Sequence, residues 1–230
     1  MPFTLDVETE DFEKGIIYFP VVGMLIGVIL FTAAKFLMPF LDPLTLAVTL
    51  VFLEVLLTGG LHLDGLADSF DGLFSYRDKE RMLEIMKDSR IGSNGVLALI
   101  FVLLAKTALV NALLVQAWLI PLLLMPVLSR FMTIFASKIS KYARPSGMGN
   151  FFIGKVSYKK LFIGLGFTGI WIFLFAPSLW WLLIPMMLTT WWFSKFCDRQ
   201  IGGMTGDTLG ANTELQELLV LFLAVLSFRF

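Results

Sequence analysis

Apolar stretches near the length that a helix needs to cross a bilayer, about 17–25 residues, recur along this chain. Of its 230 residues 57% are hydrophobic and 16% are charged, whereas a soluble domain usually carries about 25% charged residues. The mean hydropathy is +0.83. The apolar stretches therefore leave too few residues for a large soluble domain. The sequence predicts an all-α fold, a polytopic integral membrane helical bundle that forms one domain over residues 1–230.

Hydropathy and turn residues predict about seven transmembrane helices. The expected spans are 15–38, 44–61, 95–118, 119–137, 161–176, 179–194 and 215–228. The first six pair into hairpins, because proline and small residues favour tight turns in the three short links between them. Those links are 39–43, 116–121 and 176–178.

Basic residues predict the orientation of the bundle. The segment 137–160 contains no acidic residue. Its basic residues are Lys138, Lys141, Arg144, Lys155, Lys159 and Lys160. The positive-inside rule places this segment in the cytoplasm, and counting spans puts the other long polar segments on the same side. We therefore expect a multi-pass protein of the cell membrane, with cytoplasmic active-site loops at about 62–94, 138–160 and 195–214, and an external C-terminus.

Composition also excludes several classes of function. The net charge is zero and no basic run is interleaved with aromatic residues, so no nucleic-acid partner is expected. Cys197 is the only cysteine, which excludes an intramolecular disulfide and a paired-cysteine metal site. The lipid bilayer is the one partner that composition predicts.

Acidic residues gather in the polar segment that follows the second span. Asp64, Asp68 and Asp71 have the spacing i, i+4 and i+7, which places all three on one face if the segment is helical. Three neighbouring carboxylates repel one another unless a cation lies between them, and oxygen ligands suit Mg²⁺ or Mn²⁺. Glycines at positions 59, 60, 65 and 72 permit close backbone approach. The sequence thus predicts a divalent-metal site.

Three further residues near the aspartates are candidates for catalysis. Arg90 is suited to bidentate contact with phosphate, and Asp88 to metal binding or proton transfer as a general base. His62, the only histidine, is suited to act as a base or to polarise a phosphate, and a hydrogen-bonded structural role is equally consistent with its position.

Two later loops have the composition of substrate-binding segments. Arg144 is followed by Ser146 and Gly147 in a glycine-rich loop, which resembles a phosphate cradle built from backbone N–H groups. The second loop, at 202–214, is rich in glycines and hydroxyls. Its candidate substrate-binding residues are Thr205, Asp207 and Glu214.

These segments together resemble the cobalamin synthase family, adenosylcobinamide-GDP ribazoletransferase. The run GGLHLDGLAD at 59–68 is followed by Asp71-Gly72, by MKDSRIG at 86–92 and by Gly95. The resemblance extends to YFPVVG at 18–23 with Ile26-Gly27, to Arg144-Pro145 with Gly147, and to GGMTGDTLG at 202–210 with Glu214. It covers nearly the whole chain in the family's order. The acidic segment 6–13 and Ser69-Phe70 depart from the family pattern.

The resemblance implies an Mg²⁺-dependent membrane enzyme of the last stage of cobamide assembly. Such an enzyme joins adenosylcobinamide-GDP to α-ribazole, or to α-ribazole 5′-phosphate, and releases GMP. In this interpretation Asp64, Asp68 and Asp71 bind Mg²⁺ through the pyrophosphate, and Arg90 and Arg144 hold phosphates. Asp88 is a fourth ligand or the base, and Asp207 positions the second substrate. A homo-oligomer, or association with other corrinoid-pathway enzymes, is compatible with this role.

Two alternatives remain open from the sequence. A CDP-alcohol phosphotransferase also uses an Asp-Gly-x-x-Ala element in a membrane helix, but Asp68 stands where that family has arginine. A transporter would place ionisable residues deep within its spans. The ones found here, Lys35, Glu54, Lys106 and Arg130, show no pattern along the sequence.

Overall fold

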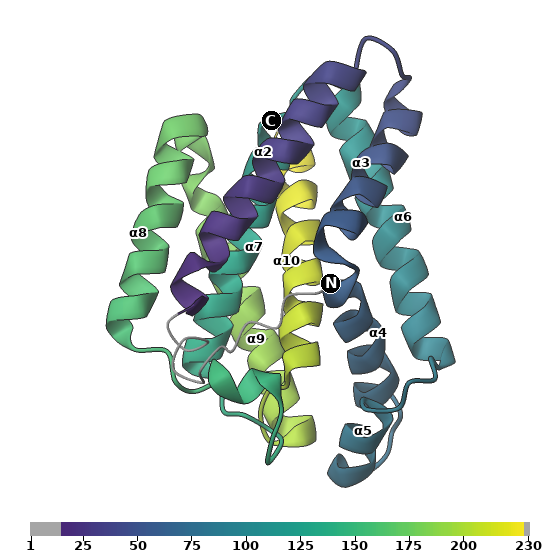
Figure 1. The fold of residues 1–230 in the computed structure, drawn as a ribbon, viewed down its shortest axis with the longest axis vertical. Coiled ribbons are helices and arrows are strands. Elements are labelled where there is room, and N and C mark those ends of the chain that lie inside the picture. The colour runs from purple at the N-terminus through teal and green to yellow at the C-terminus, as the bar shows by residue number, and fades with distance from the viewer. Residues whose placement is uncertain (1–14, 228–230) are drawn as a thin grey trace, which may run out of the picture.

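The computed structural model describes residues 15–227, and all of its regular elements are helices, which confirms the all-α prediction (Figure 1). Within these residues five helices are long and apolar enough to cross a membrane. They are η1–α2 (Ile16–Leu37), α6 (Ser93–Val115), α7 (Ile120–Ile139), α8 (Tyr158–Phe175) and α10 (Gly206–Ser227). The acidic segment 6–13 and Phe228, at the end of the seventh expected span, lie outside the described residues.

The second expected span, 44–61, corresponds to a helix that ends at Thr58 and is followed by a sharp bend. Helix α3 (Pro43–Thr58) and helix α4 (Leu61–Leu73) together would make a sixth span, but they meet at an angle of 89°. Between them Gly59 and Gly60 adopt left-handed conformations, with φ of 62° and 70°. Glycine takes this conformation without the steric cost of a Cβ, and it ends a helix. The bend turns α4 out of the line of α3 and gives the aspartates a helix of their own.

The expected span at 179–194 begins as a 3-10 turn, η3 (Pro177–Leu182), which continues into α9 (Leu183–Ile201). Helix α9 carries Lys195, Asp198 and Arg199 in its last turns and is not among the helices of the described chain that could span a membrane. By length and apolar composition, five helices of residues 15–227 could span a membrane, or six if α3 and α4 count as one span, against the seven spans expected. The remaining elements are the short helices α5 (Lys79–Ile85) and η2 (Met148–Phe151).

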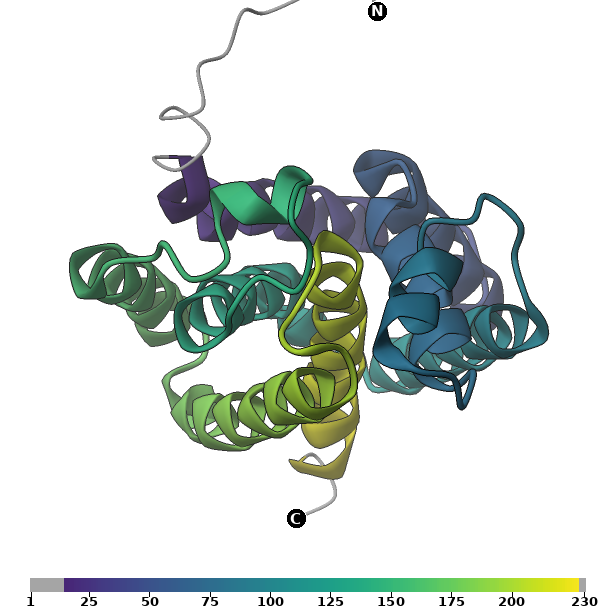
Figure 2. The ribbon, with the colours of Figure 1, turned by 90° about the horizontal axis from the view of Figure 1, so that it is seen from below.

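Helix α7 lies inside the bundle and α10 packs against it (Figure 2). In α7, 89% of the apolar window is buried, against 22% in the peripheral helix α8. Helix α2 crosses α7 closely, because a Cβ on Gly23 or Gly27 would overlap the backbone of Pro126 or Leu123. The core of the bundle thus depends on glycines that let backbones approach.

The polar segments gather at one end of the bundle. Figure 1 shows the links α2–α3, α6–α7 and α8–α9 at the top, and α5, the segment after α7 and the α9–α10 turn at the bottom. This arrangement matches the expectation that all long polar segments share one side. It brings parts of the chain that are up to about two thirds of its length apart, such as α4 and the start of α10, into contact.

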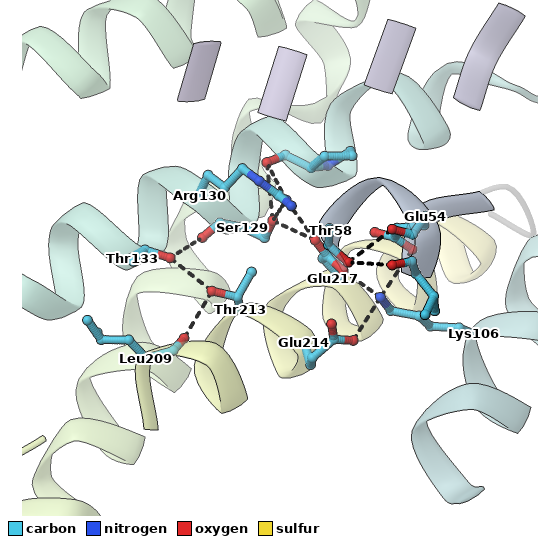
Figure 3. Close-up of polar contacts among 12 residues, drawn as sticks. Glu54, Thr58, Lys106, Ser129, Arg130, Thr133, Leu209, Thr213, Glu214 and Glu217 are labelled. Carbon is cyan, nitrogen blue, oxygen red and sulfur yellow. Dashed lines mark hydrogen bonds and ion pairs between the residues drawn. The ribbon is translucent and has the colours of Figure 1, made fainter. Parts of the chain in front are cut away.

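A network of buried charges joins four helices in the middle of the bundle (Figure 3). Lys106 Nζ on α6 lies 3.2 Å from Glu54 on α3, 2.8 Å from Glu214 and 2.5 Å from Glu217, both on α10. Arg130 on α7 pairs with the other oxygen of Glu217 at 2.9 Å. All five side chains are at most 7% exposed.

The network corrects the sequence-based statement that the charges within the spans have no pattern. Glu54, Lys106 and Arg130 are partners of one cluster, and the residue that links them is Glu217, which the sequence analysis did not single out. Lys35 is different, because it is exposed at the end of α2. Pairing of charges inside a membrane bundle is the expected way to reduce the cost of burying them.

We expect Lys106→Met to destabilise the bundle strongly, because three buried carboxylates would lose their shared cation. Breaking a buried ion pair on one side costs on the order of 3–5 kcal/mol. Thermal unfolding of the detergent-purified protein would show a lower Tm and a lower monodisperse yield. Lys35→Met, at an exposed site, is the matched control and should leave both unchanged. Equal stability of the two variants would contradict this account.

Candidate active site

Helix α4 holds the three aspartates that the sequence spacing selected. It is helical over Leu61–Leu73, as the i, i+4, i+7 spacing required, and the residues between the aspartates are buried against neighbouring helices. Asp64 is exposed, and Asp68 and Asp71 are half-buried. The three carboxylates nevertheless have different surroundings.

Asp71 faces the beginning of α6. Its two carboxylate oxygens accept hydrogen bonds from the backbone N–H groups of Gly92, at 2.6 Å, and Gly95, at 2.8 Å. A Cβ at either glycine would overlap that carboxylate, so only glycine allows this contact. A negative charge at a helix N-terminus is stabilising. Asp71 therefore fixes the loop before α6 to α4.

Asp207 joins Asp64 and Asp68 from another part of the chain. Asp64 and Asp207 lie near enough to Asp68 for their charges to repel its carboxylate. Asp207 sits in the first turn of α10, and the Cβ that Gly65 lacks would come within 2.7 Å of its carbonyl oxygen. Close packing of α4 on α10 thus forms an acidic cluster of Asp64, Asp68 and Asp207.

Thr205 and Thr208 fix the start of α10. The backbone N–H of Thr208 donates to the hydroxyl of Thr205 at 3.2 Å, and the N–H of Thr205 donates to the hydroxyl of Thr208 at 2.8 Å. Reciprocal bonds of this kind satisfy N–H groups that a helix end leaves unpaired. The Thr205 hydroxyl also donates to the Asp207 carboxylate at 3.4 Å. Thr205, expected to bind substrate, is buried and orients Asp207.

Arg144 supplies the positive charge at this cluster. Its guanidinium lies 2.8 Å from a carboxylate oxygen of Asp207, and its side chain is 11% exposed. It also reaches the carbonyl oxygen of Met86 at 3.5 Å. Arg144 therefore joins the segment after α7 to α10 and to the end of α5, at the edge of the three carboxylates.

The glycine-rich loop after Arg144 is exposed at Ser146 and Gly147. The Tyr142 hydroxyl donates to the carbonyl oxygen of Ser146 at 3.1 Å. Gly147 has a φ of 137°, a conformation that requires glycine. The turn is thus held in a defined shape beside Gly149, whose N–H lies near Gly206 at the start of α10.

Asp88 and Arg90 form a second group, away from Asp207. The Arg90 guanidinium donates to both oxygens of Asp88, with Nε–Oδ1 and Nη2–Oδ2 distances of 3.0 and 2.7 Å. The hydrogen bond from the Arg90 side chain lowers the pKa of Asp88 to about 2. Both line a shallow depression of about 420 Å³ that also contains Asp71. Asp71 therefore lies between the two groups.

His62 lines a cavity of about 310 Å³ that Asp64 and Asp207 also line. The cavity lies between α2, α4, α7 and α10 and is mostly apolar. The Nδ1 atom of His62 is buried with no hydrogen-bond partner among the described residues. The structure thus separates His62 from Asp88 and Arg90 and places it beside the acidic cluster.

Glu214 lies deeper in the bundle than the sequence analysis supposed. It is two helical turns beyond Asp207 on α10, is 4% exposed and pairs with Lys106. Its predicted contact with substrate would have to be made inside the bundle rather than in a surface loop.

The fit of a divalent cation can be judged from the donor set. Within residues 15–227, no three acidic, histidine or cysteine side chains are grouped so that together they could hold a metal ion. Mg²⁺, however, is usually bound through one or two carboxylates, with water and substrate phosphates completing its coordination. The hard oxygens of Asp64, Asp68 and Asp207, which repel one another, suit that mode.

Two features of the site escaped the sequence analysis. The approach of Asp207 to Asp64 and Asp68 depends on the packing of α10 on α4, which no local spacing encodes. The apolar cavity beside them draws residues from four helices and a loop. The glycines at 65 and 206 were the available signal, because glycine beside aspartate permits close backbone approach.

Comparison with known proteins identifies the family. Residues 1–225 match the family described as cobalamin-5-phosphate synthase. The chain is 45% identical over 219 residues to the adenosylcobinamide-GDP ribazoletransferase of Alkaliphilus metalliredigens, with 94% of this chain and 87% of that protein covered. It is 42% identical over 219 residues to the protein of that name from Klebsiella pneumoniae, covering 94% and 89%.

A third relative is more distant but is matched over its length. The adenosylcobinamide-GDP ribazoletransferase of Clostridioides difficile is 37% identical over 243 residues, with 100% of this chain and 95% of that protein covered. No solved structure matches the chain. The family match over residues 1–225 and these relatives, each matched over nearly the whole chain, show that the chain belongs to the cobalamin-5-phosphate synthase family of transferases.

Proposed function

We propose that this chain is an Mg²⁺-dependent adenosylcobinamide-GDP ribazoletransferase. It would join adenosylcobinamide-GDP to α-ribazole, or to α-ribazole 5′-phosphate, and release GMP. The observation that carries the proposal is the cluster of Asp64, Asp68 and Asp207 beside Arg144, next to a cavity that Asp64 and Asp207 line, in a member of this family. A cluster of acids and one arginine suits a pyrophosphate that binds together with a cation.

The proposed reaction is a substitution at phosphorus. A ribose hydroxyl oxygen of α-ribazole forms a bond to the phosphorus on the cobinamide side of the pyrophosphate. The bond from that phosphorus to the bridging oxygen breaks, and GMP leaves with the bonding electrons. The proton of the attacking hydroxyl passes to a base. Charge grows on phosphoryl oxygens during this step, so its catalysis depends mainly on positioning and electrostatic stabilisation.

The residues of the acidic cluster would bind and orient the pyrophosphate. Asp64 and Asp68 are the proposed Mg²⁺ ligands, and Asp207 is near enough to contribute. The bound cation would neutralise charge on the phosphate oxygens. Arg144 would contact the same phosphates by exchanging its present partner, Asp207, for a phosphate oxygen. Asp71 would act by holding the loop 88–92 against α4.

The proton acceptor is better sought in this cluster than at Asp88. A carboxyl whose pKa is about 2 is a weak base at neutral pH, and its pairing with Arg90 makes it weaker still as an acceptor. Asp88 and Arg90 instead form a preorganised pair next to Asp71, in a depression wide enough for a phosphate-bearing group. We assign Arg90 to phosphate contact and Asp88 to its orientation.

The orientation that basic residues predict places these groups in the cytoplasm of the cell. The site lies at the polar end of the bundle, where α5 and the loops gather. Nucleotide substrates of a biosynthetic enzyme are cytoplasmic, which agrees with this orientation. A lipid enzyme of the CDP-alcohol type would need a CDP-activated substrate and would release CMP, so identification of the released nucleotide separates the two functions.

Replacement of either proposed metal ligand should abolish most activity. We expect Asp64→Asn or Asp68→Asn to lower kcat/KM by about 100-fold or more, or ~2.7 kcal/mol of transition-state stabilisation. EDTA should remove the activity of the wild-type protein and Mg²⁺ should restore it, measured as GMP release. Glu80→Gln, an exposed acid on α5, is the matched control. Full activity of the wild type in metal-free buffer would refute the metal proposal.

The two arginines should respond differently to substitution. Arg144→Ala should mainly raise KM for adenosylcobinamide-GDP, because a ground-state phosphate contact is lost. Arg90→Lys keeps the charge but cannot reproduce the bidentate geometry, so it should lower kcat. Steady-state kinetics would measure both, with the exposed Arg77→Ala as control. An unchanged KM in Arg144→Ala would leave that loop a structural turn, and wild-type constants in Arg90→Lys would remove Arg90 from the site.

Cysteine labelling should reveal the orientation of the bundle. In a Cys197→Ala background, cysteines at the exposed positions Glu80 and Ser146 should react with a membrane-impermeant maleimide only after the inner face is opened. A cysteine at Phe40, which is 73% exposed in the α2–α3 link, should react in intact cells. The reverse pattern would overturn the proposed cytoplasmic position of the active site.

A further inference from the structure

The cavity behind the acidic cluster has a lining unlike that of the cluster itself. Phe19, Leu61, Phe152 and Leu209 are its large apolar lining residues, and Asp64, Gly206 and Asp207 line it on the side of the acidic cluster. Phe19 and Phe152 meet edge to face, with ring centroids 5.4 Å apart. The volume of about 310 Å³ is at the lower end of the roughly 300–1,000 Å³ of small-molecule sites.

We propose that this cavity binds the apolar, planar base of the nucleoside substrate, so that its ribose points out toward Asp64 and Asp207. The inference rests on the proposed function and adds to it the place and the chemical class of the second substrate's base. α-Ribazole is a ribosyl benzimidazole, whose fused rings are flat and largely apolar. Aromatic walls stabilise such rings by burial and by edge or face contacts.

The volume of the cavity excludes the corrin ring, the largest part of adenosylcobinamide-GDP. A corrin ring with its side chains is far too large for this cavity, which leaves the guanine of adenosylcobinamide-GDP as the competing occupant. The choice between guanine and benzimidazole depends on the polar groups that the cavity offers.

Apart from the carboxylates of Asp64 and Asp207, which are assigned to the cation and the phosphates, few of the polar groups that line the cavity are free. The hydroxyls of Thr133 and Thr213 lie 2.9 Å apart, so one donates to the other. Each is also within hydrogen-bond distance of a carbonyl oxygen of its own helix, that of Ser129 or Leu209, so both hydroxyl protons have acceptors inside the protein. His62 is the one lining residue with a ring nitrogen. Guanine carries several donors and acceptors, and each one buried without a partner would cost about 1–3 kcal/mol. A benzimidazole riboside has a single free ring nitrogen, which one imidazole can match.

The position of Asp64 and Asp207 in the lining of the cavity also suits the reaction. With the base inside, the ribose lies between Gly206 and the acidic cluster, where the pyrophosphate is proposed to bind. The attacking hydroxyl is then held next to the phosphorus that it attacks. Holding two reactants in this way can contribute several kcal/mol to the lowering of the barrier, about 7–11 in favourable cases.

Two substitutions change the volume of the cavity, one by enlarging it and the other by reducing it. Phe152→Ala removes an aromatic wall. Gly206→Leu adds a side chain to the cavity lining next to Asp207. The backbone tolerates this change, because the heavy atom nearest to a Cβ at position 206 is the Gly149 nitrogen, at 3.8 Å. Phe162→Ala, on the exposed face of α8, is the matched control.

The test measures GMP release by the full-length protein, with each substrate varied in turn while the other is saturating. The ribosides of 5,6-dimethylbenzimidazole and of imidazole are compared, each as a substrate or as a competitive inhibitor. Both cavity variants should raise KM for the benzimidazole riboside about tenfold or more. Phe152→Ala should change the constant for the smaller imidazole riboside, which has less ring to place against this wall, by less than about threefold. KM for adenosylcobinamide-GDP should stay at the wild-type value in Phe152→Ala and Phe162→Ala.

The outcomes separate this inference from the function on which it rests. If the wild type releases no GMP with any riboside, the proposed function fails. If it does release GMP but the KM for the benzimidazole riboside is unchanged in both cavity variants, only the assignment of the cavity is overturned. A rise confined to KM for adenosylcobinamide-GDP would assign the cavity to guanine instead. Equal loss for both ribosides in Phe152→Ala would indicate a general defect and would also overturn it.

Discussion

The arrangement of the site depends on the ion pairs that Lys106 and Arg130 make with Glu217 inside the bundle. These contacts hold α10 against α6 and α7, and Glu54 extends them to α3. Asp207 lies ten residues before Glu217 on the same helix, about 15 Å along its axis. Any rotation or shift of α10 that broke the buried pairs would therefore also move Asp207 away from Asp64 and Asp68. A costly buried network thus sets the register of the helix that completes the acidic cluster.

Glycines convert that register into close contact. Gly65 on α4 packs against the backbone of Asp207, and Gly210 on α10 packs against the backbone of His62, so the two helices meet without side chains between them. A single added methyl group at Gly65 would separate the helices and the carboxylates that they carry. The same residues border the apolar cavity. The approach of α4 to α10 therefore brings together both the acidic and the apolar residues that line the proposed substrate site.

Local sequence patterns were sufficient for some of these features and not for others. The helical spacing of Asp64, Asp68 and Asp71 follows from the geometry of one helix and was confirmed. Contacts between helices were not accessible in this way: Asp71 turned out to bind the N–H groups of Gly92 and Gly95, and Asp207 to join the other two acids. The sequence contains two adjacent glycines, Gly59 and Gly60, at the point where the helix breaks, but only the structure shows that both take the left-handed conformation. Charges in spans require partners, a rule that could have led from Lys106 to Glu217.

The ion pair between Arg144 and Asp207 has a consequence for the order of binding in the proposed reaction. Arg144 offsets the charge of Asp207 while no phosphate is present. When Arg144 turns to a phosphate, Asp207 loses that neutralisation and its repulsion of Asp68 grows. A divalent cation bound to the same phosphate would relieve this repulsion, because it would bring positive charge to the carboxylates. Pyrophosphate and cation are therefore expected to bind more tightly together than either binds alone, because one arginine cannot balance three carboxylates.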